Sequence, residues 1–383
     1  MSRNIESFPR PASREPMALL AVDRAISDLR RGRPVVVRGS GGFAALILAT
    51  EAVTASALAG FDQPEIGPIQ VVITNRRAMA LGLPGIPDRA IVLKAEADLT
   101  ADSILMLADP TTTDDTPSSI DGLTATAAEP FDCASAAVAM AKIARLLPAA
   151  TLAYLDSAQI DDVNAWARRR DFMIVDAGDV FQHQASSART LKLVGEARVP
   201  LADAENTRIL AFRPHDGGIE HLAIVIGEPD PKKPVLARIH SECFTGDLLG
   251  SLRCDCGDQL RGAIQEIAAQ GSGVLLYLAQ EGRGIGLVNK LRAYTLQDRG
   301  FDTMDANEML GFDADERVYL PAARMFRHLG FSKIRLMTNN PDKVAALEAC
   351  GLDIVERVPH AFPSNAHNED YLKTKAHKGG HFI

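Results

Sequence analysis

Apolar residues in the first half of the chain follow two spacings, one typical of helices and one typical of strands. The apolar positions within 19–29 approximate one face of a helix, whereas the β-branched run 35–37 predicts a buried strand. Residues 110–130 are rich in Thr, Ser, Asp and Pro, which predicts a loop. Helix and strand alternate, so we expect an α/β domain that ends near residue 190. The further strands expected are 69–74, 90–94, 151–155 and 171–176, and the further helices are 134–147 and 158–170.

The second half has a pattern of its own, and we expect the stretch 190–207 to connect the two halves. It opens with β-rich segments and continues with alternating helices and strands. The sequence therefore predicts an α/β (α+β) fold with a flexible arm over 1–16, a first domain over 17–195 and a second domain over 200–383. The expected strands of the second domain are 208–213, 219–226, 234–239, 274–278 and 334–338, and its helices are 258–270, 322–329 and 342–350.

Composition narrows the class of protein. Of the 383 residues, 46% are hydrophobic and 23% are charged, which excludes a mainly disordered, collagen-like or disulfide-framework protein. No apolar run of 18 residues predicts a membrane span, and the N-terminal residues have no secretory-signal pattern. The net charge of −8 argues against a general binder of nucleic acid or membranes. Five cysteines, a small and odd number, favour a reducing cytosol, so we expect a cytoplasmic protein.

The sharpest chemical signal is a group of three cysteines. Cys243 follows His240-Ser241-Glu242, and Cys254 and Cys256 come shortly afterwards. Thiolates at this spacing favour zinc, and three protein ligands leave one tetrahedral position for water. The alternatives are a closed structural zinc site, with His240 or a distant His as the fourth ligand, and three thiols without a metal. Cys133 and Cys350 lie in Ala-rich helical patterns and are expected to be packing residues.

Three further motifs follow strands or precede helices. The turn 280–286 (QEGRGIG) comes after strand 274–278, and its glycines let backbone N–H groups approach an anion, although such turns are common without a ligand. The run 313–317 (DADER) fits either an extended loop or an acidic helix start. The run 338–343 (TNNPDK) follows a strand, where a phosphate or a purine can bind, or it simply caps the next helix.

From about residue 205 to its end, the chain resembles GTP cyclohydrolase II of riboflavin biosynthesis. One position departs from the family pattern, because Ala279 stands where an Arg commonly precedes Gln-Glu-Gly-Arg. The matching runs are ARIHSECFTGDLLGSLRCDCGDQL (237–260), QEGRGIGLVNKLRAYTLQDRGFDTMDAN (280–307), GFDADER (311–317), RLMTNNPDKV (335–344) and NEDYLKTKAHKGGH near the C-terminus.

The resemblance implies an enzyme that hydrolyses GTP, opens the purine imidazole ring, and releases formate and pyrophosphate. The product would be 2,5-diamino-6-(5-phosphoribosylamino)pyrimidin-4-one, in the first step of riboflavin biosynthesis. The resemblance also implies one Zn²⁺ per chain, held by Cys243, Cys254 and Cys256, and Mg²⁺ with the GTP phosphates; a homodimer is expected. The positions that look like GTP contacts are Arg238, Ile239, His240, Ser241, Glu242, Gln259, Glu281, Gly282, Arg283, Thr303, Thr338 and Lys343.

Three residues correspond to catalytic positions of that family: Asp315 to its proton acceptor, Arg317 to its proposed nucleophile toward the α-phosphorus, and Tyr294 to a catalytic tyrosine. Attack at C8 of the purine needs a strong nucleophile, and zinc lowers the pKa of bound water to roughly 7. Tyr294 could protonate the departing nitrogen. A guanidinium is protonated at neutral pH, so an electrostatic clamp is the alternative role for Arg317.

The first half resembles 3,4-dihydroxy-2-butanone 4-phosphate synthase, which is often fused ahead of the cyclohydrolase. The resemblance rests on the order of GRPVVV, ATEAVT and GEARVP. That enzyme uses an acidic run for Mg²⁺ and acid–base chemistry, together with a His. Here residues 29–50 contain no Asp or Glu, and no His precedes His183. We therefore expect a degenerate, non-catalytic domain with a structural or regulatory role.

Two alternatives to the riboflavin enzyme remain at this point. One is a GTP-opening paralogue that serves another pathway, such as pyrimidine catabolism. The other is a weakly active GTP-binding scaffold, which would need neither zinc ligands nor catalytic residues.

Overall fold

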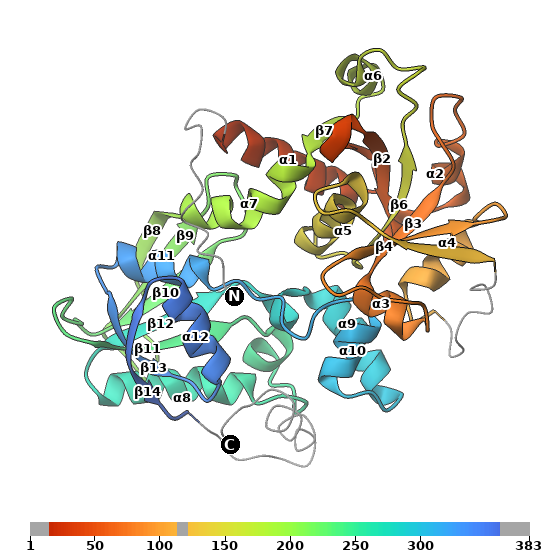
Figure 1. The fold of residues 1–383 in the computed structure, drawn as a ribbon. Helices are drawn as coiled ribbons and strands as arrows, with labels where there is room; N and C mark the ends of the chain where they lie inside the picture. Colours follow the sequence, from red (N-terminus) through yellow and green to blue (C-terminus); the bar gives the residue numbers. More distant parts are fainter. Residues whose placement is uncertain (1–14, 113–121, 361–383) are drawn as a thin grey trace. The chain divides into compact units, whose positions relative to one another are not determined.

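The computed structural model describes residues 15–112 and 122–360, and these divide into two compact units (Figure 1). The N-terminal unit contains the described residues of Pro11–Gln184 together with Ile285–Glu316. The C-terminal unit contains Ala185–Gly284 and the described part of Arg317–Ile383. The division therefore does not follow a single linear boundary near residue 195, because Ile285–Glu316 folds with the first half. Most of the expected arm 1–16 and the run NEDYLKTKAHKGGH lie outside the described residues.

The N-terminal unit is built on one seven-stranded sheet. Neighbouring strands are antiparallel except for the parallel pair at one edge, β1 and β7. In spatial order the strands are β5 (Leu123–Ala127), β4 (Ala90–Ala95), β3 (Gln70–Thr74), β6 (Ala149–Tyr154), β2 (Ala44–Ala49), β1 (Val35–Arg38) and β7 (Met173–Asp176). The helices contributed by the first half are α1 (Glu15–Arg30), α2 (Ala55–Ala59), α3 (Asn75–Ala80), α4 (Ala101–Ala108), α5 (Cys133–Ile143), α6 (Val163–Arg169) and α7 (Ala177–Arg189), which continues into the C-terminal unit.

The C-terminal unit is built on a second seven-stranded sheet, antiparallel at its start and parallel afterwards. The expected β-rich start and the later alternation are both present, and the mixed α/β class with two sheets is confirmed. In spatial order the strands are β14 (Asp353–Val358), β13 (Lys333–Met337), β11 (Val235–Ser241), β12 (Gly273–Leu278), β10 (His221–Ile226), β9 (Thr207–Arg213) and β8 (Lys192–Arg198). Its helices include α8 (Cys256–Ala269), α11 (Leu320–His328) and α12 (Pro341–Ala349), and Gly351 follows α12 at a φ of 82°.

Several elements differ from the expectation. The stretch 190–207, expected as a connection, contains β8, and the loop expected over 110–130 contains β5. Strands β2 and β14 were not predicted. β8 pairs with β9 along one side, and all of its residues but Leu193 are exposed, so it lacks the apolar alternation that marks a half-buried strand.

Each sheet has a core that matches its sequence. In the N-terminal unit the Ala-rich helix α5 packs closely on the sheet, and Cys133 is buried among its apolar neighbours as expected of a packing residue. In the C-terminal unit the aromatic side chains Phe212, Phe326 and Phe331 are buried in one cluster. These cores fix the strand ends from which the site residues project.

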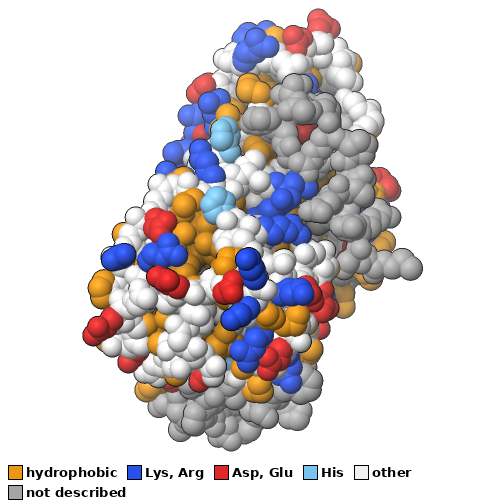
Figure 2. Space-filling view, turned by 90° about the vertical axis from the view of Figure 1, so that its left-hand side faces the viewer, with side chains coloured by type: hydrophobic (Ala, Val, Ile, Leu, Met, Phe, Trp, Pro, Cys, Tyr) orange, Lys and Arg blue, Asp and Glu red, His pale blue; other side chains and the backbone are white. Residues whose placement is uncertain are grey.

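The described part of the chain contains no helix that is both long and apolar enough to cross a membrane. On the face presented in Figure 2, acidic and basic side chains occur among neutral and apolar ones, and neither sign covers the described surface.

Candidate active site

The candidate site of the C-terminal unit lies where three parallel strands end. Strands β11, β12 and β13 run in the same direction, and Ser241 at the end of β11 is level with Leu278 at the end of β12. Cys243 follows β11, Glu281 follows β12 and Thr338 follows β13. Ligands of open α/β sheets bind at this edge, so the topology gathers residues that are distant in sequence.

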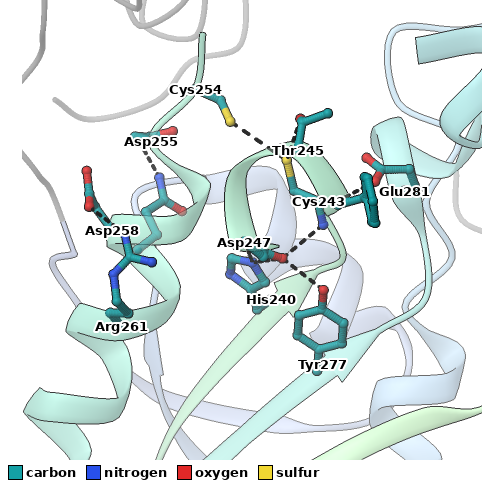
Figure 3. A network of polar contacts seen from close by, with 12 residues as sticks. His240, Cys243, Thr245, Asp247, Cys254, Asp255, Asp258, Arg261, Tyr277 and Glu281 are labelled. Carbon is teal, nitrogen blue, oxygen red and sulfur yellow. Dashed lines mark hydrogen bonds and ion pairs between the residues drawn. The ribbon is translucent and has the colours of Figure 1, made fainter. Parts of the chain in front are cut away.

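The three cysteines of the sequence motif lie together at this edge. The Sγ atoms of Cys243, Cys254 and Cys256 all lie within 4.8 Å of one another. Those of Cys243 and Cys254 are 3.7 Å apart (Figure 3). Cys243 precedes a single π-helical turn, Phe244–Leu248, and Cys256 is the first residue of α8. Two loops therefore present three thiols to one point.

The donor set and the space around it fit a divalent, borderline-soft metal ion. A Cβ atom on Gly246 would lie 2.7 Å from Sγ of Cys254 and 3.1 Å from Sγ of Cys243, so only glycine leaves the thiols this close to the turn. Hydrogen bonds with Cys243 raise the pKa of the Cys254 and Cys256 thiols, since a thiol that donates keeps its proton, and repulsion from a neighbouring thiolate adds to this effect. A bound cation would reverse this effect, since thiolates are the ligands that zinc prefers.

His240 does not join the thiols, although the sequence allows it as a fourth ligand. Its Nε2–H donates to the carboxylate of Asp247, with distances of 3.0 and 3.1 Å to the two oxygens. Burial lowers the pKa of His240, only partly offset by Asp247, so the ring is neutral at pH 7. Among the residues that the structure describes, the cluster thus offers three ligands and no fourth. An open position of this kind is typical of a catalytic zinc site.

Asp247 connects the thiol loop to the sheet, and the sequence reasoning did not single it out. Its Oδ2 accepts the backbone N–H of Cys243 at 2.9 Å and the hydroxyl of Tyr277 at 2.9 Å, in addition to the contact with His240 (Figure 3). The rings of His240 and Tyr277 stack with centroids 5.6 Å apart. Burial, followed by the Asp247 charge, raises the pKa of Tyr277, so its hydroxyl stays protonated and donates.

The Glu281 carboxylate links the glycine-rich turn 280–286 to its surroundings by accepting two backbone hydrogen bonds. One oxygen accepts the backbone N–H of Phe244 at 2.6 Å, and the other accepts that of Gly282 at 2.9 Å. Gly282 and Arg283 both adopt left-handed backbone conformations, with φ values of 64° and 61°. For Arg283 this conformation is strained, a feature that concentrates at functional sites. The carboxylate thus couples the turn to the loop of Cys243.

Two buried positive side chains contact the backbone of β13 and β11. Arg238 donates through its guanidinium to Met337 O at 2.8 Å and also to the Gln259 side chain. Burial lowers the pKa of Arg238 to about 10, with Arg317 contributing, so Arg238 stays charged at neutral pH. Lys343 donates to Ile239 O at 3.1 Å. Buried cations at one edge favour an anionic ligand.

The ring of Tyr319 lies near two positive side chains, and the sequence motifs did not indicate this residue. The Nζ atom of Lys343 lies 5.9 Å from the centroid of its ring, and the Cζ atom of Arg317 lies 5.7 Å from it. Such distances are typical of cation–π contacts, so the ring of Tyr319 helps to hold both positive groups.

Several polar atoms at this edge have no hydrogen-bond partner within residues 15–112 and 122–360. They include Nε of Arg238, Nδ1 of His240 and Oγ of Ser241, all buried. Buried polar atoms are normally satisfied, so a polar ligand is the natural partner for them.

Other predicted GTP contacts are engaged within the unit. Gln259 also donates to Asp255, and its backbone carbonyl accepts Nε2–H of His360 at 2.9 Å. The Thr338 hydroxyl accepts the backbone N–H of Asn340, and the Glu242 backbone N–H donates to Leu278 O. These contacts fix the residues around the strand ends.

Three predicted residues belong to the N-terminal unit instead. Tyr294 lies on α9 (Leu287–Asp298), Thr303 begins α10 (Thr303–Met309), and Asp315 lies in the non-helical segment between α10 and α11. The run 313–317 is thus a loop and not the start of a helix. Their catalytic and binding roles remain predictions.

Comparisons with known proteins identify the family of the chain. A family model described as GTP cyclohydrolase II matches residues 192–359. A GTP cyclohydrolase-2 of Azospirillum brasilense is 55% identical over 96% of this chain and 94% of its own length. Riboflavin biosynthesis protein RibBA of Phocaeicola vulgatus is 36% identical over 96% of this chain and 99% of its length.

One solved structure, a two-domain 3,4-dihydroxy-2-butanone 4-phosphate synthase named RibBX from A. baumannii, covers 89% of this chain and 99% of its own. Its TM-score is 0.36 at 16% identity, which is too low to define the fold.

The family model and the relative that is 55% identical over most of both chains show that this chain is an enzyme. The chain belongs to the GTP cyclohydrolase II family of riboflavin biosynthesis.

Proposed function

We propose that the carboxyl edge of β11, β12 and β13 opens the imidazole ring of GTP in a zinc-dependent hydrolysis that releases formate and pyrophosphate. The observation that carries this proposal is the placement of three thiols and two buried cations at one sheet edge. The product would be the 2,5-diaminopyrimidine nucleotide that begins riboflavin biosynthesis.

Cys243, Cys254 and Cys256 would hold one Zn²⁺ per chain. When bound, zinc supplies Lewis acidity that activates water at neutral pH. Asp247 and Glu281 hold the ligand loop through the backbone N–H groups of Cys243 and Phe244. The protein thereby orients the thiol of Cys243 before the metal binds.

Arg238, Arg317 and Lys343 would bind the triphosphate, with Mg²⁺ on the phosphates. Arg238 and Lys343 are held by backbone carbonyls, so their positive charges are in place without a large rearrangement. The unpartnered Nε of Arg238 and Oγ of Ser241 suit phosphate or ribose oxygens. Arg317 would act on the α-phosphate as a nucleophile or as an electrostatic clamp.

The remaining roles belong to residues of Ile285–Glu316, which is part of the N-terminal unit. Tyr294 would protonate the departing nitrogen, Thr303 would contact GTP, and Asp315 would accept a proton. We also propose that the chain forms a homodimer in the cytoplasm. Its first half would have no synthase activity.

Product identification by mass spectrometry after incubation with GTP tests the reaction, and elemental analysis tests the metal. We expect one zinc per chain, together with formate and pyrophosphate from GTP. Cys254→Ser should lose zinc and slow formate release by about 10²-fold or more, since the activated water is lost. Cys350→Ser, outside the cluster, is the matched control.

Full zinc retention in a chain carrying both Cys254→Ser and Cys256→Ser would contradict the ligand assignment. A chain that binds GTP yet forms no product would instead be a scaffold.

A further inference from the structure

We propose that the N-terminal unit positions the catalytic segment, defined as Ile285–Glu316, and that Lys142 is a positioning residue for the GTP reaction. This inference rests on the proposed function, which places Tyr294, Thr303 and Asp315 in the reaction. It assigns a role to the first half of the chain, whose sequence lacks the acidic groups of a synthase.

The catalytic segment shares its hydrophobic core with the N-terminal sheet. Its apolar residues do not form a separate cluster but join side chains from β3, β4 and α4. Burial of this kind makes the segment's folding dependent on the first half of the chain. The buried residues of the segment are Ile285, Ala293, Leu296, Ala306, Leu310 and Phe312, and those of the first half include Val71, Ile73, Leu93, Ile104, Leu107 and Leu147.

Two side chains at the start of α3 hold the backbone of the segment. The Thr74 hydroxyl donates to Gly311 O at 2.7 Å. The buried guanidinium of Arg77 donates to Met309 O at 3.1 Å and to Leu107 O at 2.8 Å. Arg77 thus joins the C-terminal ends of α10 and α4, where carbonyl groups attract a positive charge.

Charged contacts hold α9 as well. The guanidinium of Arg292 lies 2.5 Å from an oxygen of Glu51 and 3.0 Å from one of Asp109. All three side chains are at least three-quarters buried, and Arg292 also donates to Asn289 Oδ1 at 2.8 Å. A buried pair of acids facing one arginine fixes the helix that carries Tyr294.

Lys142 clamps the loop around Asp315. From the end of α5, its Nζ lies 3.3 Å from an oxygen of Asp313 and 2.5 Å from one of Glu316. The same Glu316 oxygen accepts the backbone N–H of Asp313 at 2.9 Å. One ammonium group therefore closes a loop of four residues, and Asp315 lies inside that loop.

A second cation supports the clamp. Arg76 lies 3.2 Å from the other carboxylate oxygen of Asp313 and also contacts Glu308. Burial alone would raise the pKa of Asp313, yet Lys142 and Arg76 outweigh burial and lower it, so the clamp is charged at neutral pH. Both cations come from the N-terminal half of the chain.

The test uses the full-length chain with Lys142→Met, which removes the clamp but keeps the side-chain length. Hydrogen–deuterium exchange of peptides covering 309–319 measures attachment, and formate release from GTP measures the reaction. We expect faster exchange in these peptides and a kcat lowered about tenfold, because small displacements of a catalytic group are costly. Zinc content and KM should change less than twofold.

Two variants complete the design. Lys94→Met makes the same substitution at an exposed position of β4 and should match the parent. Lys142→Arg keeps the positive charge and should restore most of the kcat and the protection, which a role in packing alone would not explain.

Unchanged exchange in Lys142→Met would overturn the attachment, and faster exchange with an unchanged kcat would overturn the positioning role. A parent chain that releases no formate would overturn the proposed function and the catalytic meaning of the segment. The exchange measurement would still decide whether the N-terminal unit holds it.

Discussion

The buried Asp247 carboxylate, which lies in the π-helical turn, accepts hydrogen bonds from three donors. They are the ring of His240 in β11, the hydroxyl of Tyr277 in β12 and the backbone N–H of Cys243. A buried carboxylate is stable only when such donors surround it. The stability of the ligand loop therefore depends on one negative charge.

Asp247→Asn should lower the free energy of unfolding by about 2–4 kcal/mol, because an amide nitrogen cannot accept where an oxygen did and the charge is lost. Tyr277→Phe removes one donor and should cost about 1–2 kcal/mol. Urea unfolding of the metal-free chain measures both. Equal effects of the two variants would show that the carboxylate is not the centre of the network.

Gly246→Ala tests the space beside the thiols. The added methyl group would meet Sγ of Cys254 at 2.7 Å, so the ligand loop must shift and zinc affinity should fall by about 10–100-fold. Competition with a chelator measures the affinity. Gly195→Ala is the matched control, since a Cβ there meets nothing within 4 Å. Unaltered affinity in Gly246→Ala would mean that the turn yields without cost.

Sequence reasoning found the thiols because three cysteines at short spacing form a local signal. It missed Asp247, Tyr277 and Tyr319, since an acid or a tyrosine inside a strand or turn has no local mark. The partner of Tyr277 lies 30 residues away, at Asp247, so only the folded chain reveals this contact.

At the scale of elements, the five inner strands of the C-terminal sheet were predictable and its two edge strands were not. Apolar runs such as 274–278 and 334–338 predicted β12 and β13, because β12 is buried on both faces and the apolar residues of β13 are buried. β8 and β14 are edge strands with exposed, charged residues, and their hydrogen bonds come from one neighbour. Edge strands of this kind escape a reading based on hydrophobic period.

His360 fastens the chain after β14 to α8. Its Nε2–H donates to Gln259 O at 2.9 Å, while its backbone exchanges two hydrogen bonds with the Asn339 side chain. Burial, with a contribution from Arg238, lowers the pKa of His360 to about 4.

This pKa predicts a pH dependence. Between about pH 4 and the ordinary histidine value near 6.5, the unfolded chain binds a proton that folded His360 does not. The free energy of unfolding should therefore fall as the pH is lowered through this window, by about 1.4 kcal/mol per unit of pKa difference. His360→Gln keeps an N–H donor without titrating. Urea unfolding at several pH values should give a shallower slope for this variant, and parallel curves would contradict the assignment.

At the scale of the whole molecule, the sequence predicted a domain boundary near residue 195. It did not predict that Ile285–Glu316 folds with the first half of the chain. That segment continues the cyclohydrolase motifs, so resemblance assigns it to the second half. Its apolar residues pack on the first half, and packing partners distant in sequence leave no trace in local periodicity.

The first half should have no synthase activity. The full-length chain, incubated with ribulose 5-phosphate and Mg²⁺, should form no dihydroxybutanone phosphate, because residues 29–50 contain no carboxylate to hold the metal or move a proton. Product formation above the rate without protein would show that acids elsewhere replace the missing ones.

The shared core of the N-terminal unit also sets an order of events during synthesis. A ribosome adds residues from the N-terminus onward, so β3, β4 and α4 emerge long before Leu296, Leu310 and Phe312. One side of the nascent first half must stay exposed to the cell until the end of the catalytic segment has been made. During that interval a chaperone can bind the uncovered apolar side chains, and a premature stop before residue 285 would leave a chain prone to aggregation or degradation.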